Sequence, residues 1–254
     1  MVTESKGRLV ILSGPSGVGK SPLAKALNKF HPECSGRLRV LVLYNSRDPR
    51  PGERDGVDYH FRTRSQIEAF RSNPGYVLWD VRGDLQALDL EDLDALLGRS
   101  DVLFEGNPFV GVTLLEHPRL EGIKRLAIFL SPLSKEEIAY LKAPERNLSL
   151  QDLVTDIMRR KLLRRTRRQK GQLSALDLEN IERRAGSAYG EMQAAWKFDY
   201  VIPNHDGEDS DNWEAFYHPL GDARKSLKAF VALLEGKVPA EAEKWDAELL
   251  PAAS

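Results

Sequence analysis

Short aliphatic runs alternate with amphipathic stretches along most of the chain. The runs are almost continuously apolar, as in strands of a parallel sheet that is covered on both faces. The amphipathic stretches 22–30 and 222–234 have apolar residues at helical spacing, and Gly236 follows the second as a helix-ending glycine. The pattern predicts an α/β fold with a parallel sheet between two layers of helices. The expected strands are 8–13, 38–43, 101–105, 125–130 and 198–202.

Two segments interrupt this alternation and look inserted between core elements. Residues 45–97 begin with a loop rich in proline, glycine and arginine, and residues 142–190 are helical, charged and strongly basic at their centre. We expect one domain over 1–254, with an acidic loop near 205–212 and a tail, 237–254, that is either a loosely docked helix or disordered. The expected core consists of 1–44, 98–141 and 191–236.

Composition limits the classes of protein to consider. Hydrophobic residues make up 41% of the 254 positions, which suits a globular protein with a sizeable core. The net charge is −1, which excludes a protein that binds polyanions through an overall positive charge. The one cysteine, Cys34, forms no intramolecular disulfide and favours a reducing compartment. The polar segment 1–6 is unlike a signal peptide, and no apolar run is long enough to span a bilayer. We expect a cytoplasmic monomer or homodimer without a nucleic-acid or membrane partner.

A phosphate-binding motif lies between the first expected strand and the first expected helix. Gly14-Pro-Ser-Gly-Val-Gly-Lys-Ser21 matches G-x-x-x-x-G-K-[ST], in which glycines let the backbone approach phosphate oxygens and successive N–H groups form an anion-binding nest at a helix N-terminus. Lys20 is expected to bridge the terminal phosphates of ATP and the Ser21 hydroxyl to ligate Mg²⁺. The alternative is a glycine-rich turn from strand to helix that binds nothing. The expected ATP contacts are Gly14, Ser16, Gly17, Val18, Gly19, Lys20, Ser21 and Pro22.

Pro22 is an irregular feature of this motif. A proline is tolerated in the first helical turn, where its missing N–H has no helical partner in any case. It disfavours helical geometry at the preceding residue, Ser21, and can thereby shift the metal-binding hydroxyl.

The next segment indicates which reaction the motif serves. Ser46-Arg-Asp-Pro-Arg-Pro-Gly-Glu-Arg-Asp-Gly-Val-Asp-Tyr-His-Phe61 resembles the signature loop of guanylate kinases, T-R-x-P-R-x-G-E-x-x-G-x-D-Y-x-F, with Ser46 in place of the threonine. Weaker similarity covers most of the chain, with insertions near 142–158 and 206–219. The resemblance implies a three-layer P-loop NTPase core that carries two inserts, an acceptor-binding (NMP-binding) insert at 45–97 and an arginine-rich lid at 142–190.

The resemblance also assigns roles within this loop. Arg47 and Arg50 are planar forks that can grip a phosphomonoester bidentately, and Tyr59 can donate a further hydrogen bond. The family gives these three the role of holding the acceptor phosphate, with Glu53 and Asp58 orienting the arginines. The alternative is a solvated, charged turn, since such composition is ordinary in surface loops.

The base-reading positions depart from the family. Leu78 stands where a glutamate is usual before a tryptophan, Leu43 where a serine is usual, and 83–87 lacks the usual tyrosine pair. The D-x-D at the end of the third core strand is Glu105-Gly-Asn107, and we expect both residues to contact the acceptor. Because lost hydrogen-bond partners change specificity by orders of magnitude, the acceptor stays open at this point. The polar replacements to consider are Asp80, Asp84, Gln86 and Asn107.

A basic segment, 159–170, carries eight positive charges in twelve residues. The resemblance implies a lid whose arginines close over ATP, since phosphoryl transfer spreads negative charge over three equatorial oxygens. Arg165 and Arg168 are the candidates in the segment, Arg184 matches the arginine of the following family helix, and Arg146 competes if no insertion is assumed. A nucleic-acid patch and a solvated helical face are the alternatives.

Other candidates are weaker. Glu105 can hold a metal-bound water or help activate the acceptor, or simply cap a loop. The resemblance gives Asn204 a contact with adenine, and a turn-forming role is the alternative. The histidines show no metal-ligand spacing. We expect Cys34 to be buried and the tryptophans outside the acceptor insert, Trp196, Trp213 and Trp245, to be packing residues.

These features predict a nucleoside monophosphate kinase that transfers the γ-phosphoryl group of ATP to an acceptor phosphate, with ATP and Mg²⁺ bound. The catalytic side chains expected are Lys20, Arg47, Arg165 and Arg184. Two alternatives remain. One is a kinase of the same fold that acts on another phosphorylated small molecule, such as a modified nucleotide or a sugar phosphate. The other is a regulatory module that binds ATP without turnover.

Overall fold

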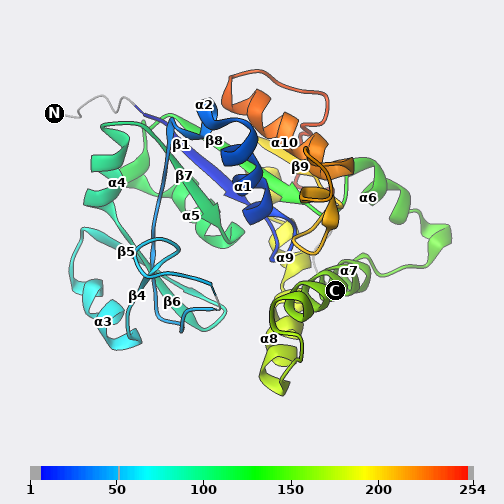
Figure 1. Ribbon diagram of the computed structural model, residues 1–254, viewed down its shortest axis with the longest axis horizontal. Helices are drawn as coiled ribbons and strands as arrows, with labels where there is room; N and C mark the ends of the chain where they lie inside the picture. The colour runs from blue at the N-terminus through cyan, green and yellow to red at the C-terminus, as the bar shows by residue number, and fades with distance from the viewer. Residues whose placement is uncertain (1–6, 51, 251–254) are drawn as a thin grey trace.

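A computed structural model describes residues 7–50 and 52–250 of the chain (Figure 1). The polar segment 1–6, Pro51 of the predicted acceptor loop and the last four residues of the predicted tail lie outside the described residues. Every central strand runs parallel to its neighbours, in the order β2-β7-β1-β8-β9. The prediction of a parallel α/β core is therefore confirmed. These strands are β1 (Leu9–Ser13), β2 (Leu38–Val40), β7 (Asp101–Gly106), β8 (Arg125–Ser131) and β9 (Tyr200–Pro203).

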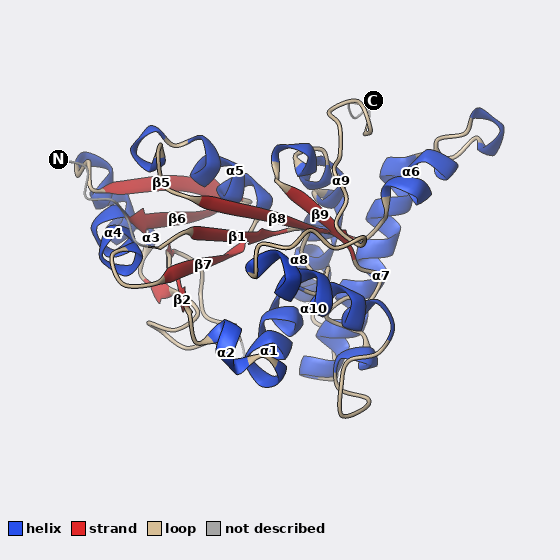
Figure 2. Ribbon diagram, turned by 90° about the horizontal axis from the view of Figure 1, so that it is seen from above, coloured by secondary structure: helices blue, strands red, loops and turns tan. Residues whose placement is uncertain are grey.

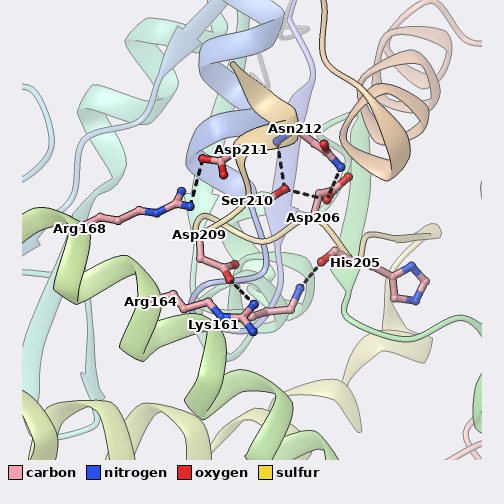
Figure 3. Close-up of a pocket in the computed structure, with 9 residues that line it drawn as sticks. All are labelled: Lys161, Arg164, Arg168, His205, Asp206, Asp209, Ser210, Asp211 and Asn212. Carbon is pink, nitrogen blue, oxygen red and sulfur yellow. Dashed lines mark hydrogen bonds and ion pairs between the residues drawn. The ribbon is translucent and has the colours of Figure 1, made fainter. Parts of the chain in front are cut away.

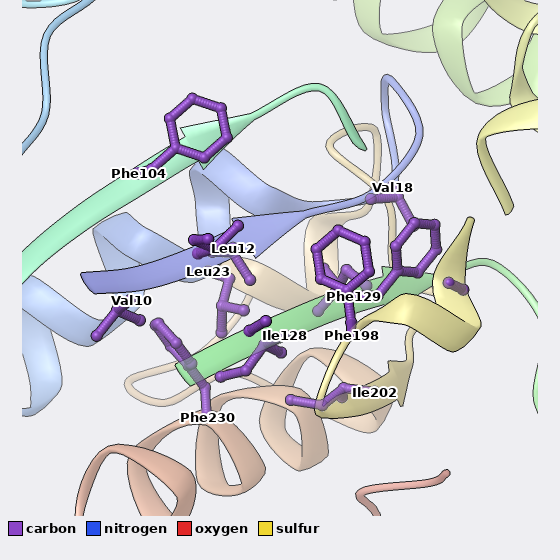
Figure 4. Close-up of a cluster of buried hydrophobic side chains, with 14 of the residues drawn as sticks. Val10, Leu12, Val18, Leu23, Phe104, Ile128, Phe129, Phe198, Ile202 and Phe230 are labelled. Atoms are coloured by element: carbon purple, nitrogen blue, oxygen red, sulfur yellow. The ribbon is translucent and has the colours of Figure 1, made fainter. Parts of the chain in front are cut away.

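Helices cover both faces of this sheet. Figure 2 shows α1 (Lys20–Phe30), α2 (Pro32–Ser35) and α10 (Gly221–Leu234) together on one side and α5 (Pro108–Glu116) on the other. The core lies between these layers. Leu12 of the sheet, Leu23 of α1 and Phe230 of α10 are buried there, as Figure 4 illustrates. Burying such side chains contributes about 1.5–3 kcal/mol each, which fixes β1 and α1 on either side of the phosphate motif.

A second, smaller sheet forms the acceptor insert. Its strands lie in the order β4-β3-β6-β5, and only β3 and β4 are parallel. The hairpin of β5 and β6 turns at Arg82 and Gly83, whose positive φ angles of 58° and 89° suit a tight two-residue turn. Ile67, Leu85 and Ala87 form a separate small core under this sheet. The elements are β3 (Tyr44–Asn45), β4 (His60–Phe61), α3 (Arg64–Glu68), β5 (Tyr76–Val81), β6 (Asp84–Asp89) and α4 (Leu90–Leu97).

The second insert is a pair of helices that extends from the core. In Figure 1, α7 (Leu150–Lys170) and α8 (Ala175–Gly186) lie side by side below the central sheet, and α9 (Ala188–Met192) leads the chain back to it. A serine caps the N-terminus of each long helix, Ser149 for α7 and Ser174 for α8. Before them, α6 (Lys135–Leu141) follows β8. Short 3₁₀ turns cover Ala69–Ser72, Pro118–Leu120, Pro144–Arg146, Ala195–Lys197 and Asp211–Trp213.

Three predictions about the periphery of the molecule need correction. The tail forms neither a helix nor a disordered segment over 239–250: Glu243 exchanges two backbone hydrogen bonds with Val201 of β9, and Trp245 is buried. The second predicted strand is shorter, because the chain leaves the central sheet after Leu41 to enter the acceptor insert. Trp196 is 46% exposed and packs little.

The predictions for Cys34, for two of the tryptophans and for Gly236 are confirmed. Cys34, Trp213 and Trp245 are buried, and Gly236, with φ 79°, ends α10 as predicted. Between residues 7 and 250, apart from Pro51, no helix is both long and apolar enough to cross a bilayer. The same residues contain no group of three or more histidine, cysteine or acidic side chains placed to hold a metal ion.

Candidate active site

The phosphate motif forms a loop between β1 and α1, directly beside the loop that follows β9. Gly19 is the N-cap of α1 with φ 110°, and a Cβ at this position would lie 2.5 Å from the amide nitrogen of Asn204. Only glycine fits there, because both the backbone conformation and the close neighbour exclude a side chain. The two loops are also joined by the Glu208 N–H, which donates to the Gly17 carbonyl at 3.1 Å.

Lys20 lies inside this loop. Its side chain is buried, and Nζ donates to the carbonyls of Gly14 and Pro15 at 2.8 and 3.0 Å. Burial lowers the pKa of Lys20, and the carboxylates of Glu208 and Glu105 partly offset that effect. An ammonium group held in this way has no ion-pair partner within 4 Å among the described residues, so a phosphate would meet a cation that is poorly compensated.

Ser21 at the start of α1 contacts Glu105 near the carboxyl end of β7. The Ser21 hydroxyl donates to Glu105 Oε1 at 2.6 Å, and burial raises the pKa of Glu105. Helical geometry holds at Ser21 despite Pro22, which occupies the third position of α1. A hydroxyl beside a carboxylate suits Mg²⁺, which binds proteins through one or two oxygen ligands and takes the rest from phosphate and water.

The arginine loop folds around Glu53. Arg47 makes a two-pronged ion pair with this carboxylate at 2.6 and 2.7 Å, and the backbone N–H of Arg50 donates to it at 2.7 Å. The Arg47 guanidinium also lies 5.1 Å from the centre of the Tyr59 ring. Glu53 thus orients both arginines, which is the arrangement expected for an acceptor-phosphate site.

Asp58 does not take part in this arrangement as predicted. Its carboxylate accepts the backbone N–H of Arg54 at 2.8 Å and so closes the turn instead of orienting Arg47 or Arg50. Arg50 keeps an exposed guanidinium, 3.9 Å from Glu53. Partial loss of hydration, and then repulsion from Arg47 and Arg165, lowers the pKa of Arg50.

The second insert brings two further arginines to the same region. Arg165 pairs with Glu208 at 2.5 Å, beside the phosphate loop. Burial, together with Arg50 and Arg165, lowers the pKa of Arg184 to about 9, and its Nε has no hydrogen-bond partner among the described residues. A cation in this position is destabilised by its neighbours, and a bound anion would relieve that repulsion.

The other two lid candidates have different partners. Arg168 pairs with Asp211 at 3.0 Å on the surface. Arg146 stacks over the exposed ring of Tyr140 at 3.4 Å, in the segment between α6 and α7 that extends away from the phosphate loop (Figure 2). Because its contact is with Tyr140 of α6, we do not assign Arg146 to the site.

Basic side chains of α7 meet the acidic loop that follows β9. Lys161 Nζ donates to the His205 carbonyl at 2.6 Å, and Arg164 pairs with Asp209 at 3.4 Å, across a pocket of about 460 Å³ (Figure 3). Ion pairs with carboxylates neutralise much of the basic segment, which argues against a nucleic-acid footprint. The paired side chains are Arg159, Arg160, Arg164, Arg165, Arg168 and Lys170. The pocket is lined by Lys161, Arg164, Arg168, His205, Asp206, Asp209, Ser210, Asp211 and Asn212.

Asn204 supports the phosphate loop from behind. The side chain is fully buried, and its amide donates to the carbonyls of Val18 and Asp206 at 2.8 and 2.7 Å. The expected contact with adenine is thus corrected, because a base cannot reach an amide whose hydrogen bonds are used inside the protein.

The departures at the base-reading positions have a packing explanation. Leu78 packs against the small core of the acceptor insert, and Leu43 is buried in the main core. Asp80 pairs with Arg64, and the Asn107 amide is engaged at both ends, capping α5 and donating to Glu191. Neither of these two polar replacements is free to read a base. Gln86 and Asp84 remain on β6, on the side of the insert that carries Asn45.

Three residues that make contacts in this region were not predicted from the sequence. Arg82 of the β5–β6 turn contacts both Ser16 of the phosphate loop and Glu191 of α9, and Glu208 pairs with Arg165. The Arg-Gly pair at 82–83 signals a hairpin turn. No sequence signal indicates what its arginine reaches, since the partners lie 66 and 109 residues away.

The phosphate loop holds a poorly compensated lysine, a second loop carries two arginines around Glu53, and a lid helix brings Arg165 to the side of the phosphate loop. An arrangement of this kind passes a phosphoryl group from one bound phosphate to another, which defines the protein as a P-loop phosphotransferase.

Comparisons with known proteins specify the family. The guanylate kinase family model matches residues 6–77. The chain is 33% identical to a guanylate kinase of Synechococcus sp. (strain JA-3-3Ab) over 85% of this chain and 84% of that protein, and 30% identical to one of Chlorobaculum tepidum over 79% and 86%. The fold resembles the crystal structure of guanylate kinase from Anaplasma phagocytophilum, with a TM-score of 0.55 and 18% identity over 94% of this chain and 90% of that one.

This chain belongs to the guanylate kinase family. It is a nucleoside monophosphate kinase, an ATP-dependent phosphotransferase, and the predictions of family, fold class and enzyme class are confirmed.

Proposed function

We propose that this protein transfers the γ-phosphoryl group of ATP to the phosphate of GMP, giving ADP and GDP. The observation that carries the proposal is the pair of arginines, Arg47 and Arg50, that Glu53 holds together in one loop. Family membership favours GMP among nucleoside monophosphates, since the relatives are guanylate kinases.

Positioning and charge account for the catalysis. An oxygen of the GMP phosphate attacks the γ-phosphorus, the bond from that phosphorus to the β–γ bridging oxygen breaks, and ADP leaves with that oxygen. Arg47, Arg50 and Tyr59 hold the attacking phosphate, while Lys20 moves from the loop carbonyls to the β- and γ-phosphates. No covalent intermediate with the protein is needed, because in-line alignment and neutralised charge supply the rate enhancement.

The lid contributes cations that change partner during the reaction. Arg165 pairs with Glu208 without substrate, and Arg184 lies among other arginines with an unpaired Nε. In the ternary complex we expect both guanidinium groups on the transferring phosphoryl group, where negative charge develops. Arg168, whose partner Asp211 is 79% exposed, is left out of this role.

Mg²⁺ fits the oxygen pair of Ser21 and Glu105. Ser21 would hold the ion directly and Glu105 through a water molecule, and the ion when bound neutralises charge on the β- and γ-phosphates. Ser21 in helical geometry keeps its hydroxyl directed to Glu105.

The pocket between α7 and the loop after β9 is our candidate for the adenosine of ATP. It adjoins the phosphate loop, because the Glu208 N–H binds the Gly17 carbonyl, and it lies between lid and core. We therefore propose that adenine binds in this pocket and does not make the contact with Asn204 that the sequence had predicted. Asp206 and Asn212 supply polar atoms at its wall.

The test is ADP release from Mg-ATP with a panel of acceptors at equal concentration: GMP, dGMP, IMP, AMP, UMP and ribose 5-phosphate. Arg50→Ala is expected to raise the GMP KM and lower kcat together, by about 10²-fold in kcat/KM, because one charged phosphate contact is lost. Arg54→Ala, from the exposed part of the same loop, is the matched control and should retain activity.

Acceleration by GMP supports the proposal. Acceleration by another acceptor alone would mean that the arginine pair binds the phosphate of a different substrate. No acceleration, with ATP shown to bind, would favour a regulatory module.

The cellular setting and assembly stay predictions. The single cysteine favours a reducing cytoplasm, and the proposed reaction needs only one chain, so either a monomer or a homodimer would serve. Size-exclusion chromatography with light scattering distinguishes the two assemblies.

A further inference from the structure

The tip of the acceptor insert carries an arginine in an unusual place. Arg82 is the first residue of the two-residue β5–β6 turn and has φ 58°, a conformation in which Asn, Asp or Gly is ordinarily found. Its side chain is nevertheless only 20% exposed. An arginine at a turn position that disfavours it, with its side chain largely covered, indicates that the side chain has a task the turn alone does not require.

Arg82 reaches out of its own insert to two other parts of the molecule. Nη1 donates to the Ser16 hydroxyl of the phosphate loop at 3.1 Å, and Nη2 forms an ion pair with Glu191 of α9. In Figure 1 the hairpin and α9 come from distant parts of the chain, cyan and yellow respectively. One guanidinium thus joins the acceptor insert, the phosphate loop and the helix through which the lid returns to the core.

Glu191 is held in place to receive this arginine. Its Oε1 also accepts hydrogen bonds from Asn107 Nδ2 at 3.1 Å and from the Ser187 hydroxyl at 2.9 Å, and its side chain is 10% exposed. Asn107 in turn caps α5 at the end of β7. A carboxylate with several fixed donors keeps its orientation, so the ion pair with Arg82 has a defined geometry and not merely an attraction.

We propose that Arg82 is a positioning residue for phosphoryl transfer, which docks the acceptor insert on Ser16 and Glu191 so that the acceptor phosphate lies in line with the γ-phosphate. The inference rests on the proposed function, since it assumes an acceptor bound by Arg47 and Arg50. It adds that the alignment of the two sites depends on a contact outside both.

The physical reason is the kind of contact that holds the insert on the core. Trp79, Val81 and Leu88 of the hairpin pack in the main hydrophobic core, and such packing is not directional. Arg82, next to Val81, adds hydrogen-bonded contacts with the phosphate loop and α9 that fix the orientation of the hairpin. A misplacement of about 1 Å is enough to lower a transfer rate about 10²-fold.

The test compares Arg82→Asn, Glu191→Gln and the double variant with the natural protein. Asparagine favours the positive φ of the turn, so Arg82→Asn removes the contact without straining the hairpin. Arg71→Ala is the matched control, because Arg71 is an exposed arginine of the same insert that pairs only with its neighbour Glu68. We measure kcat, the KM values for ATP and GMP, and thermal stability.

We expect each contact variant to lower kcat about 10–100-fold while the KM for ATP changes less than about twofold, because the phosphate loop itself is untouched. The double variant should lose no more than the stronger single variant, since both remove the same contact. Arg71→Ala should match the natural protein. Unchanged kcat in Arg82→Asn, or fully multiplicative losses in the double variant, would overturn the proposal.

A distance measurement separates this inference from the proposed function. Nitroxide labels on Ser65→Cys and Lys228→Cys, with Cys34→Ala in the background, report the separation of insert and core. Both labelled positions are exposed. The proposal expects a broader distance distribution in Arg82→Asn than in the parent and in Arg71→Ala. An unchanged distribution overturns it, whether or not GMP proves to be the acceptor. Absent transfer in the natural protein would overturn the proposed function alone.

Discussion

Single residues in this active site hold charge where water is largely excluded. Burial lowers the pKa of Lys20 and raises that of Glu105, so each group is less stable in its charged form than it would be in water. Burial and neighbouring arginines also lower the pKa of Arg184. Charges that are under-compensated in the free enzyme gain most from a bound polyphosphate, which is how such a site favours the substrate and its transition state.

Lys20→Ala tests this view of the site. We expect kcat to fall about 10²–10³-fold or more, because a cation on the transferring phosphate is lost, while the melting temperature changes little or rises, because a buried charge is removed. Steady-state ADP release and thermal unfolding measure the two effects. Lys29→Ala, an exposed lysine later in the same helix, should leave both unchanged. Full activity in Lys20→Ala would contradict the assigned role.

The residues of the local motifs were predictable and their distant partners were not. The phosphate loop and the Arg47–Tyr59 loop are contiguous, so their chemistry is legible from spacing alone. Asn204 was misassigned because the sequence places it after a strand without revealing that its amide faces inward, onto Val18. Arg82 and Glu191 were missed because their contact is made by the arrangement of two inserts, which no local pattern encodes.

At the scale of elements, the short edge strand β9 is completed by the end of the chain. Val201 and Glu243 exchange backbone hydrogen bonds of 2.9 and 2.8 Å, and Trp245 is 6% exposed with its indole N–H donated to the Glu243 carboxylate. The sequence predicted the core strands well because each is an apolar run. It did not predict this tail, because one bridge and one tryptophan leave no periodic pattern.

Trp245→Ala is expected to destabilise the protein by about 3–5 kcal/mol, since a large buried side chain is lost from the edge of the sheet. The free energy of unfolding in urea gives the value. Trp196→Ala is the control: Trp196 is 46% exposed, so its loss should change the free energy by less than about 0.5 kcal/mol. Equal effects of the two substitutions would mean that the tail does not support β9.

Over the whole molecule, His205 links three elements near the ATP side of the site. Desolvation alone would lower the pKa of His205, but hydrogen bonds with Asp222 of α10 and Glu137 of α6 outweigh it and raise the pKa. The histidine itself follows β9. A protonated imidazole between two carboxylates therefore joins the ends of β9, α6 and α10.

This link predicts how stability depends on pH. Because the pKa is higher in the folded state, the contribution is fully present below the unfolded pKa of about 6.5 and is lost as pH rises through the higher folded value. For a half-exposed pair of this kind we expect up to about 1 kcal/mol. Melting temperatures measured from pH 5.5 to 9 should fall more steeply in the natural protein than in His205→Asn. Parallel curves would remove the link.

The central claim is the transfer of a phosphoryl group from ATP to GMP, and following the phosphorus atom tests it most directly. The protein is incubated with Mg-ATP labelled with ³²P at the γ-position and with GMP, and the products are separated. The account predicts that the label appears in the β-phosphate of GDP, and that Arg50→Ala slows this transfer while Arg54→Ala does not. Label found only in inorganic phosphate, in the protein itself or unmoved in ATP would contradict it.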